Sequence, residues 1–433
     1  MALRPEIVIV GAGPAGCTLA AMLAQRGYQL VVLDDARRPE LLVGESLVPA
    51  VVPIFRRLGI EDEVAALSVH KPGASFFVSN GPHLHFCFKS VEGRLPTYAY
   101  NSPRPQLDDL IHRRAKALGA TFLKIHAEVE ACEREGQPSV RLSAATKAAA
   151  EIAPDCEPFL IDATGRARAF ARVMDIPATR GDRNDIAYFA HFEDFDHDEV
   201  PDGQIIISVL THGWSWRIPL QGKLSVGVVI NKTAAKALGD TPEERIENAI
   251  KTEPLLREKG QRARRVTDVM TYTNYQLISQ RGYGPGWALL GDAYGFVDPM
   301  LSPGLFMGLE GARLLDACVF AKGAGVLKRP KALARGLEKY SRQVLKWHSS
   351  WRELIEYFYD GRIFRLYLAG RSVSLLYGKW NIVRWLEKHT TTQIAAMASG
   401  ASTRSAYSRG MVRFMSRYMN WNVPEAANYA VKD

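Results

Sequence analysis

The sequence has 433 residues, of which 47% are hydrophobic and 23% are charged, with a formal net charge of +9. This length and composition predict a globular protein of two or three packed units rather than one simple core. The five scattered cysteines favour neither a disulfide framework nor a zinc site, and we expect no metal. No apolar run approaches the roughly 18 residues that span a bilayer, and no signal-peptide pattern opens the chain, so we expect a cytoplasmic protein.

The first thirty-four residues predict a strand, a tight turn, a helix and a second strand. The apolar run Ile7–Val10 leads into Gly11, Gly13 and Gly16, which form a GxGxxG turn. In such a turn the glycines permit the sharp bend, a close approach to a pyrophosphate and tight helix–strand packing. The second strand ends at Asp34, where a carboxylate can hold ribose hydroxyls. The segment therefore predicts a dinucleotide site.

Three later segments resemble those of the glutathione-reductase-like flavoproteins. The stretch GWALLGDAYGFVDPMLSPGLFMGLEGARLLD (286–316) is similar to their second FAD-contacting motif, which implies that Asp292 holds the ribityl chain. FLIDATGRAR (159–168) resembles their Asp-x-x-Gly segment, and SPRPQLDDLIHRRAKALGA (102–120) resembles their arginine-then-helix segment, with Arg104 in the arginine position. Noncovalent FAD is therefore predicted. Because no second GxGxxG follows a strand, we expect no separate NAD(P)H domain.

Strand-rich inserts interrupt this nucleotide-binding frame, and helical spacing dominates the end of the chain. We predict an α/β protein with a Rossmann-like FAD-binding domain (glutathione-reductase and p-hydroxybenzoate-hydroxylase type), an antiparallel β-sheet substrate domain and a C-terminal helical region. These three parts are expected at residues 1–71, 101–170 and 281–327; 72–100 and 171–280; and 328–433. The alanine-rich stretch SAATKAAAEIAP (143–154) predicts an exposed loop between strands.

The segment DGQIIISVLTHGWSWRIPLQGKLSVGVVIN (202–231) predicts three strands joined by two turns. Side chains alternate across a strand, so Trp214 and Trp216 point to one face while Ser215 and Arg217 point to the other. Two adjacent indoles make a large, rigid apolar surface. Periodicity leaves two interpretations open: a sheet packed on a core, or one wall of a substrate tunnel.

A more specific resemblance emerges at this segment. Trp-x-Trp-x-Ile-Pro is a signature of flavin-dependent halogenases, and residues 214–219 fit it completely. VGESLVPAVVPIFRRLGI (43–60) is similar to the family's stretch after the second strand, and HKPGASF (70–76) to the segment with its essential lysine, here Lys71. The likeness covers about the first 320 residues and is nearest to members that act on phenols or carrier-tethered pyrroles. Leu301 stands where indole-type members carry glutamate, which argues against free tryptophan as substrate.

The resemblance implies a chemistry and a set of site residues. Reduced FAD, supplied by a separate flavin reductase, and oxygen would convert halide into hypohalous acid, and a lysine would deliver electrophilic halogen to an electron-rich aromatic, free or tethered to an acyl carrier protein. The lysine would be Lys71, with Trp214 and Trp216 separating flavin from substrate. The family pattern further implies cofactor contacts for Glu45, Ser46 and Gly304.

Two departures from the family pattern keep other reactions open. The halide-binding turn reads Ser302-Pro303-Gly304, and proline has no N–H to offer an anion. The aromatic position after the lysine segment, usually tryptophan, is Phe76 or Phe77. The alternatives are an FAD-dependent aromatic monooxygenase and a flavin reductase or dehydrogenase of a carrier-bound or lipid-like substrate. A non-enzymatic flavin-binding module is more remote.

The positive charge is concentrated near the C-terminus. Residues 341–420 hold 13 Lys and Arg against 4 Asp and Glu, whereas the rest of the chain is neutral. A solvated helical face is one explanation. Otherwise the region predicts an acidic partner, a carrier protein foremost and an anionic membrane surface as the rival, but no nucleic acid. We expect six aromatic residues to anchor that partner, Trp347, Trp351, Tyr357, Tyr359, Trp380 and Trp385.

Overall fold

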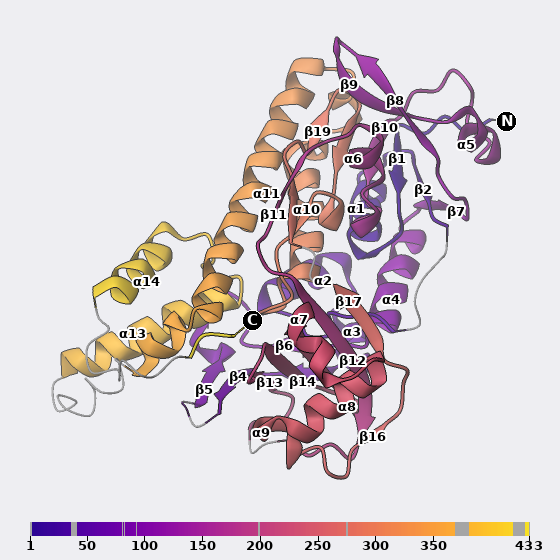
Figure 1. Cartoon of the computed structure of the whole chain (residues 1–433). Helices are drawn as coiled ribbons and strands as arrows, with labels where there is room; N and C mark the ends of the chain where they lie inside the picture. The colour runs from indigo at the N-terminus through magenta and orange to yellow at the C-terminus, as the bar shows by residue number, and fades with distance from the viewer. Residues whose placement is uncertain are drawn as a thin grey trace.

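Two β-sheets and a set of long helices organise the chain (Figure 1). The computed structural model describes residues 2–35, 41–79, 81, 83–91, 93–197, 200–273, 276–368, 381–418 and 429–432.

The smaller of the two sheets has six strands and carries the N-terminal glycine turn. Its order is β19-β20-β10-β1-β2-β7, and all neighbours are parallel except β19 at the edge. The strands are short and apolar, as expected for parallel strands that are covered on both faces. Helix α1 (Pro14–Gln25) follows β1 and packs between α4 (Arg104–Ala117) and α10 (Pro303–Cys318). The strand bounds are Ile7–Val10 (β1), Leu30–Leu33 (β2), Thr121–Leu123 (β7), Phe159–Asp162 (β10), Tyr283–Gly284 (β19) and Trp287–Leu289 (β20).

The larger sheet follows the order β16-β12-β15-β14-β13-β4-β5, with β17 also paired to β12. Its pairs are antiparallel except β13 with β4. Strands β13, β14 and β15 confirm the three strands predicted in residues 202–231. One face adjoins the main core, and the other carries a second apolar cluster that helix α8 (Pro242–Thr252) covers. The bounds are Gly73–Val78 (β4), His83–Cys87 (β5), Asp185–Glu193 (β12), Ile205–Val209 (β13), Trp214–Leu220 (β14), Lys223–Asn231 (β15), Arg264–Arg265 (β16) and Met270–Thr273 (β17).

The C-terminal part is helical. Helix α11 (Pro330–Tyr359) packs along α10, and its Tyr340 hydroxyl donates a hydrogen bond of 2.8 Å to the Leu289 carbonyl of β20. Helices α13 (Asn381–Ala398) and α14 (Ala406–Tyr418) lie at one side of the molecule, to the left in Figure 1, and α13 adjoins β5 of the larger sheet. Within the described ranges, none of the helices has an apolar stretch that would cross a bilayer. The predicted fold class is confirmed, and the residue boundaries between its three parts stay a prediction.

Short elements complete the described fold. Their bounds are Val69–Lys71 (β3), Ala99–Asn101 (β6), Val129–Arg134 (β8), Gln137–Leu142 (β9), Ala178–Arg180 (β11), Leu277–Ser279 (β18), Gly295–Phe296 (β21), Val52–Leu58 (α2), Glu61–Leu67 (α3), Ala144–Ala149 (α5), Ala169–Val173 (α6), Lys232–Ala235 (α7) and Pro254–Arg257 (α9), with short 3-10 turns at Pro49–Val51 (η1), Phe88–Val91 (η2), Gly165–Ala167 (η3), Lys236–Leu238 (η4), Gly291–Ala293 (η5), Phe320–Lys322 (η6) and Ala324–Val326 (η7).

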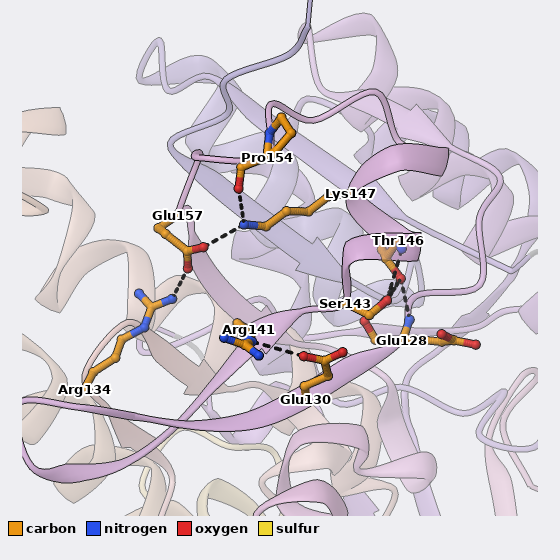
Figure 2. Close-up of polar contacts among 9 residues, drawn as sticks. All are labelled: Glu128, Glu130, Arg134, Arg141, Ser143, Thr146, Lys147, Pro154 and Glu157. Atoms are coloured by element: carbon orange, nitrogen blue, oxygen red, sulfur yellow. Dashed lines mark hydrogen bonds and ion pairs between the residues drawn. The ribbon is translucent and has the colours of Figure 1, made fainter.

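The exposed loop predicted at residues 143–154 is wrong. The segment forms the short helix α5, whose alanines favour helix, and Ser143 caps it by accepting a 3.0 Å hydrogen bond from the Thr146 amide. Lys147 is buried, and its ammonium donates to the Pro154 carbonyl at 3.0 Å and the Glu157 carboxylate at 2.6 Å (Figure 2). These contacts fix the segment to the body of the protein.

The aromatic anchors predicted in the basic region are mostly core residues. Trp347, Trp351 and Tyr357 are buried on α11, and Tyr359 is half-buried at its end. The apolar face of this long helix packs against α10, so its large rings turn inward; Trp347, for example, meets Phe306 edge to face at 4.9 Å. Trp385 alone among the described members is exposed, and Trp380 lies outside the described residues.

Candidate functional site

The three glycines in the turn between β1 and α1 are each placed differently. Gly11 has φ +105°, and a Cβ there would lie 2.4 Å from the Ala163 carbonyl oxygen. A Cβ at Gly16 would lie 2.2 Å from the Gly11 oxygen, whereas one at Gly13 would meet nothing within 4 Å. No side chain caps the first turn of α1, so its amide groups face open space. The turn is therefore an anion site of the kind that holds a pyrophosphate.

A cleft begins at this turn and continues to the larger sheet. It encloses about 1240 Å³, including solvent at its mouth. Its wall comes from six chain segments that are far apart in the sequence. The predicted site residues in the wall are Gly13, Glu45, Ser46, Arg104, Trp214, Trp216, Asp292, Ser302 and Gly304.

Two charged residues of the cleft wall are half-buried. Arg104 donates to the Val43 carbonyl at 2.6 Å and to the Asp108 carboxylate at 3.0 Å, which fixes its guanidinium beneath Gly44. Asp292 is on η5, directly after β20. Burial raises the pKa of Asp292 from 3.8 to about 6, although the positive charge of Arg104 acts in the opposite direction. The carboxylate therefore lacks the solvation that a polar ligand would supply.

The two tryptophans of β14 point to the same face, as their alternation predicts, and they form one wall of the cleft. Trp214, Trp216 and Ile218 all line it, and the two indole centroids are 5.8 Å apart. Gly227 on the neighbouring strand makes room for this wall, because a Cβ there would lie 2.2 Å from the Trp216 ring. On the opposite face Arg217 is fully buried and donates to the Ser208 hydroxyl at 3.2 Å.

Hydrogen bonds connect the tryptophan wall to the loop before α10. The Trp214 indole donates to the Tyr359 hydroxyl at 3.1 Å, and that hydroxyl donates to the Asp298 carboxylate at 3.0 Å. The same carboxylate oxygen accepts from the Met300 amide at 2.8 Å. Asp298 is fully buried. The wall and the loop are therefore held in one arrangement.

The predicted halide turn offers fewer amides than its sequence suggests. The Ser302 amide already donates to the Pro299 carbonyl at 3.0 Å, and Ser302 has a left-handed backbone with φ +57°. Pro303 occupies the first position of α10 and has no N–H. Gly304 lines the cleft, and no side chain caps this helix. Of these three positions, only Gly304 has an amide that can face an anion in the cleft.

Lys71 lies behind the cleft wall rather than in it. Its side chain is 2% exposed, and its Nζ donates at 2.7 Å to both the Ser46 hydroxyl and the Leu47 carbonyl. The Phe88 ring lies 5.4 Å away. Burial lowers the pKa of Lys71 to about 7. Ser46 lines the cleft, so one hydroxyl group separates the ammonium from it.

A buried pair that sequence reasoning missed adjoins the same wall. His191 Nε2 is 2.7 Å from the Glu45 carboxylate, and both side chains are almost fully buried. His191 lies on β12, 146 positions from Glu45, and its Nδ1 has no partner among the described atoms. No motif marks a lone histidine in a strand, so only the fold reveals this contact. The pair fixes Glu45 at the cleft.

Five predicted site residues are not in the cleft wall. Gly11 and Gly16 provide close packing, and Lys71 and Pro303 lie behind wall residues, as described above. Asp34 is half-buried at the end of β2, and its amide donates to the Leu123 carbonyl at 3.0 Å. Their contributions to ligand binding stay a prediction. Within the described residues, no cluster of three or more His, Cys, Asp or Glu side chains could hold a metal ion.

The cleft fits an FAD molecule at two chemically distinct points. The uncapped turn of α1, open at Gly13, suits the diphosphate, and the underhydrated Asp292 carboxylate suits the hydroxyls of a polyol chain. Family comparison agrees, because a model described as an FAD binding domain matches residues 4–318. The protein therefore belongs to this family of FAD-binding flavoproteins.

Similarity to curated proteins narrows the assignment. The chain is 28% identical over 363 residues to a tryptophan 2-halogenase of Chondromyces crocatus, which covers 82% of this chain and 68% of that protein. It is 25% identical over 380 residues to a 1H-pyrrole-2-carbonyl-[peptidyl-carrier protein] chlorinase of Pseudomonas fluorescens, covering 82% and 83%. A flavin-dependent brominase structure superimposes with a TM-score of 0.74 at 20% identity, over 95% of this chain and 98% of that one.

These likenesses place the protein among the flavin-dependent halogenases. The prediction of an FAD-dependent halogenase is thereby confirmed over the monooxygenase and the reductase or dehydrogenase.

We predict that Asp292→Asn strengthens the fold and weakens cofactor binding. The pKa of this carboxyl rises on folding, so its stabilising contribution is present at acid pH and is lost as the pH rises through about 6. The melting temperature of FAD-free Asp292→Asn should therefore exceed that of the native protein most clearly near neutral pH. Its FAD dissociation constant should rise about ten- to a hundredfold.

Asp62→Asn, at an exposed position of α3, is the matched control for both measurements. Calorimetric titration with FAD and thermal unfolding across the acid range provide the readout. Native FAD affinity in Asp292→Asn would remove this carboxylate from the cofactor site.

Proposed function

We propose that the enzyme halogenates an electron-rich aromatic ring, carried as an acyl group on a carrier protein, and that a separate flavin reductase supplies its reduced FAD. The observation that carries this proposal is the tryptophan wall of β14, which faces the same cleft as the dinucleotide turn. Reduced FAD supplies the chemistry that activates oxygen and oxidises halide. The protein side chains position halide, exclude the aromatic substrate from the flavin and present a proton donor to the oxygen of the hypohalous acid.

The tryptophan wall would separate the flavin from the aromatic substrate. Trp214 and Trp216 are 3% and 5% exposed, and their rings are fixed by hydrogen bonds to Tyr359 and Ser225. A rigid apolar partition of this kind keeps an aromatic ring away from the oxidising centre while a small acid passes along the cleft. Strand β14 is buried on both faces, so packing on each side holds the partition in place.

Lys71 is the proposed proton donor to the oxygen of the hypohalous acid, which would leave as water as the halogen passes to the ring and the ring loses a proton. An ammonium has three N–H groups, and the two protein acceptors at Ser46 and Leu47 leave one for a ligand atom. A pKa of about 7 means that the proton is easily given up at neutral pH. A guanidinium is planar and does not lose its proton, so arginine cannot replace this lysine.

A carrier-borne substrate is supported by two observations. One relative acts on a pyrrole-2-carbonyl group bound to a peptidyl carrier protein, and the likeness extends over 82% of this chain. The position before Ser302 is Leu301, which lines the cleft and offers no carboxylate to an indole N–H. An acyl group needs no such partner, because its thioester tether already positions the ring.

The proposal predicts incorporation of halogen into a tethered aromatic. We expect purified enzyme, given a flavin reductase, NADH, FAD, oxygen and bromide, to brominate pyrrolyl or phenolic acyl groups on carrier proteins. The bromine isotope pair in the mass spectrum is the readout. The same acyl groups as free acids are the control for tethering. A halide-independent gain of one oxygen atom would contradict the halogenase proposal, and equal rates on free acids would contradict the tether.

We predict that Lys71→Met lowers product formation at least about a hundredfold, while FAD affinity and hypohalous acid formation are retained. In the native enzyme the rate should fall as the pH rises through about 7, because Lys71 loses its proton there. The lysine pKa is lowered on folding, so the charged form opposes folding, and Lys71→Met should raise the melting temperature.

Lys89→Met, at an exposed neighbour on η2, is the control. A chemical trap for hypohalous acid separates halide oxidation from transfer to the ring. Near-native product from Lys71→Met would show that this lysine has no part in the reaction.

We predict weak halide affinity and a preference for bromide over chloride. With the Ser302 amide engaged and Pro303 lacking an N–H, the turn has lost anion donors, and the larger halide is easier to dehydrate. Pro303→Ser restores an N–H and should lower the apparent halide constant about tenfold or more. Pro330→Ser, at the equivalent first position of α11, is the matched control. Tight chloride use by the native enzyme would contradict this account of the turn.

A further inference from the structure

The exposed aromatic side chains of the described structure gather on two helices. Every large aromatic residue that stands out as exposed lies on α13 or α14. Their exposed fractions are near 60%, whereas the other large rings among the described residues are buried or half-buried. We call this surface the α13–α14 face and define it by Trp385, Lys388, His389, Tyr407, Phe414, Arg417 and Tyr418.

Helical spacing brings the rings of α14 to one side. Tyr407, Phe414 and Tyr418 are seven and four residues apart, so they share one stripe of the helix. The Phe414 and Tyr418 ring centroids are 5.1 Å apart. The opposite side, including Val412 and Met415, is buried against the protein. The stripe is therefore turned away from the side of α14 that packs on the protein.

Helix α13 extends the same aromatic surface. The Trp385 and His389 rings stack at 5.0 Å, and His389 Nε2 lies 2.8 Å from the Tyr407 hydroxyl of α14. These contacts join the two helices through their exposed rings. The rings are thus held in fixed positions rather than scattered singly over the surface.

The charge of the α13–α14 face is positive. Helix α14 contains no Asp or Glu, and its Arg417 lies beside the Tyr418 ring at 5.6 Å. Lys388 on α13 is exposed. The adjacent Glu353 of α11 is already paired with Arg409 and Arg413. Aromatic rings bordered by cations match the boundary of an anionic bilayer, where rings enter the headgroup layer and cations meet lipid phosphates.

We propose that the α13–α14 face binds an anionic phospholipid surface and attaches the enzyme to it peripherally. The position of the two helices at one side of the molecule favours a bilayer over a protein partner, because a flat surface can reach both of them there (Figure 1). A bilayer needs no complementary pocket. The proposal concerns location and stands apart from the halogenation site, whose residues lie on other elements.

Vesicle binding by the full-length FAD-loaded protein tests the proposal. We expect flotation with phosphatidylcholine vesicles that contain phosphatidylglycerol, little with phosphatidylcholine alone, and release at high salt. The triple variant Trp385→Ser, Phe414→Ser, Tyr418→Ser should lower partitioning at least about tenfold. The double variant Lys388→Glu, Arg417→Glu should do the same.

Matched controls lie far from the two helices. Val173→Ser on α6 removes another exposed apolar side chain, and Lys236→Glu on η4 reverses another exposed charge. Neither should alter vesicle binding. All variants should keep native halogenation of a soluble substrate, which separates this test from that of the proposed function.

A second readout reports the depth of the rings. Lipids brominated in their acyl chains should quench tryptophan fluorescence, and Trp385→Phe should remove most of the quenching. No binding to anionic vesicles would overturn the proposal. If the triple variant instead loses activity only on carrier-bound substrate, the face docks the carrier protein; if it abolishes a dimer, the face joins two copies of the chain. Both results also overturn it.

Discussion

The rest of the site depends on one constraint: charged groups around a single cleft are removed from water. Lys71 and Asp292 lie where solvation is poor. Burial lowers the pKa of Lys71 and raises the pKa of Asp292, so it favours the neutral form of each group. Packing alone would favour apolar residues at these positions. The fold gives up stability to hold them, and ligands in the cleft would recover part of it.

Strand β14 lines this cleft with one face and is buried on the other. An antiparallel strand commonly has one face on a core and one in solvent. Here the tryptophan face borders the cleft while Arg217 and Ser215 are fully buried behind it. The wall therefore has a core on its far side, and its position is set by two packing surfaces at once. This explains how two large rings can border an open cleft without collapsing into it.

Part of the site could be predicted from the sequence, because it follows from local backbone rules. The glycine turn and the face of Trp214 and Trp216 follow from spacing, because neither depends on distant residues. The contact of His191 with Glu45 could not be predicted, since the two are 146 positions apart and no motif joins them. The orientation of Lys71 toward Ser46 could not be predicted either, because no motif joins these two residues. The Ser302 amide donates a hydrogen bond within its own loop. The sequence did not predict this bond, because it accompanies a left-handed backbone at Ser302.

Gly227 has a consequence for how the cleft can change over evolutionary time. Its missing side chain is the space that the Trp216 ring fills, across the strand pair from β15 to β14. Any larger residue at 227 forces that ring out of the wall, and a smaller residue at 216 leaves a void beside the glycine. The two positions should therefore vary together in related sequences. Reshaping the cleft for a different ring requires paired substitutions, one on each strand, rather than a single change.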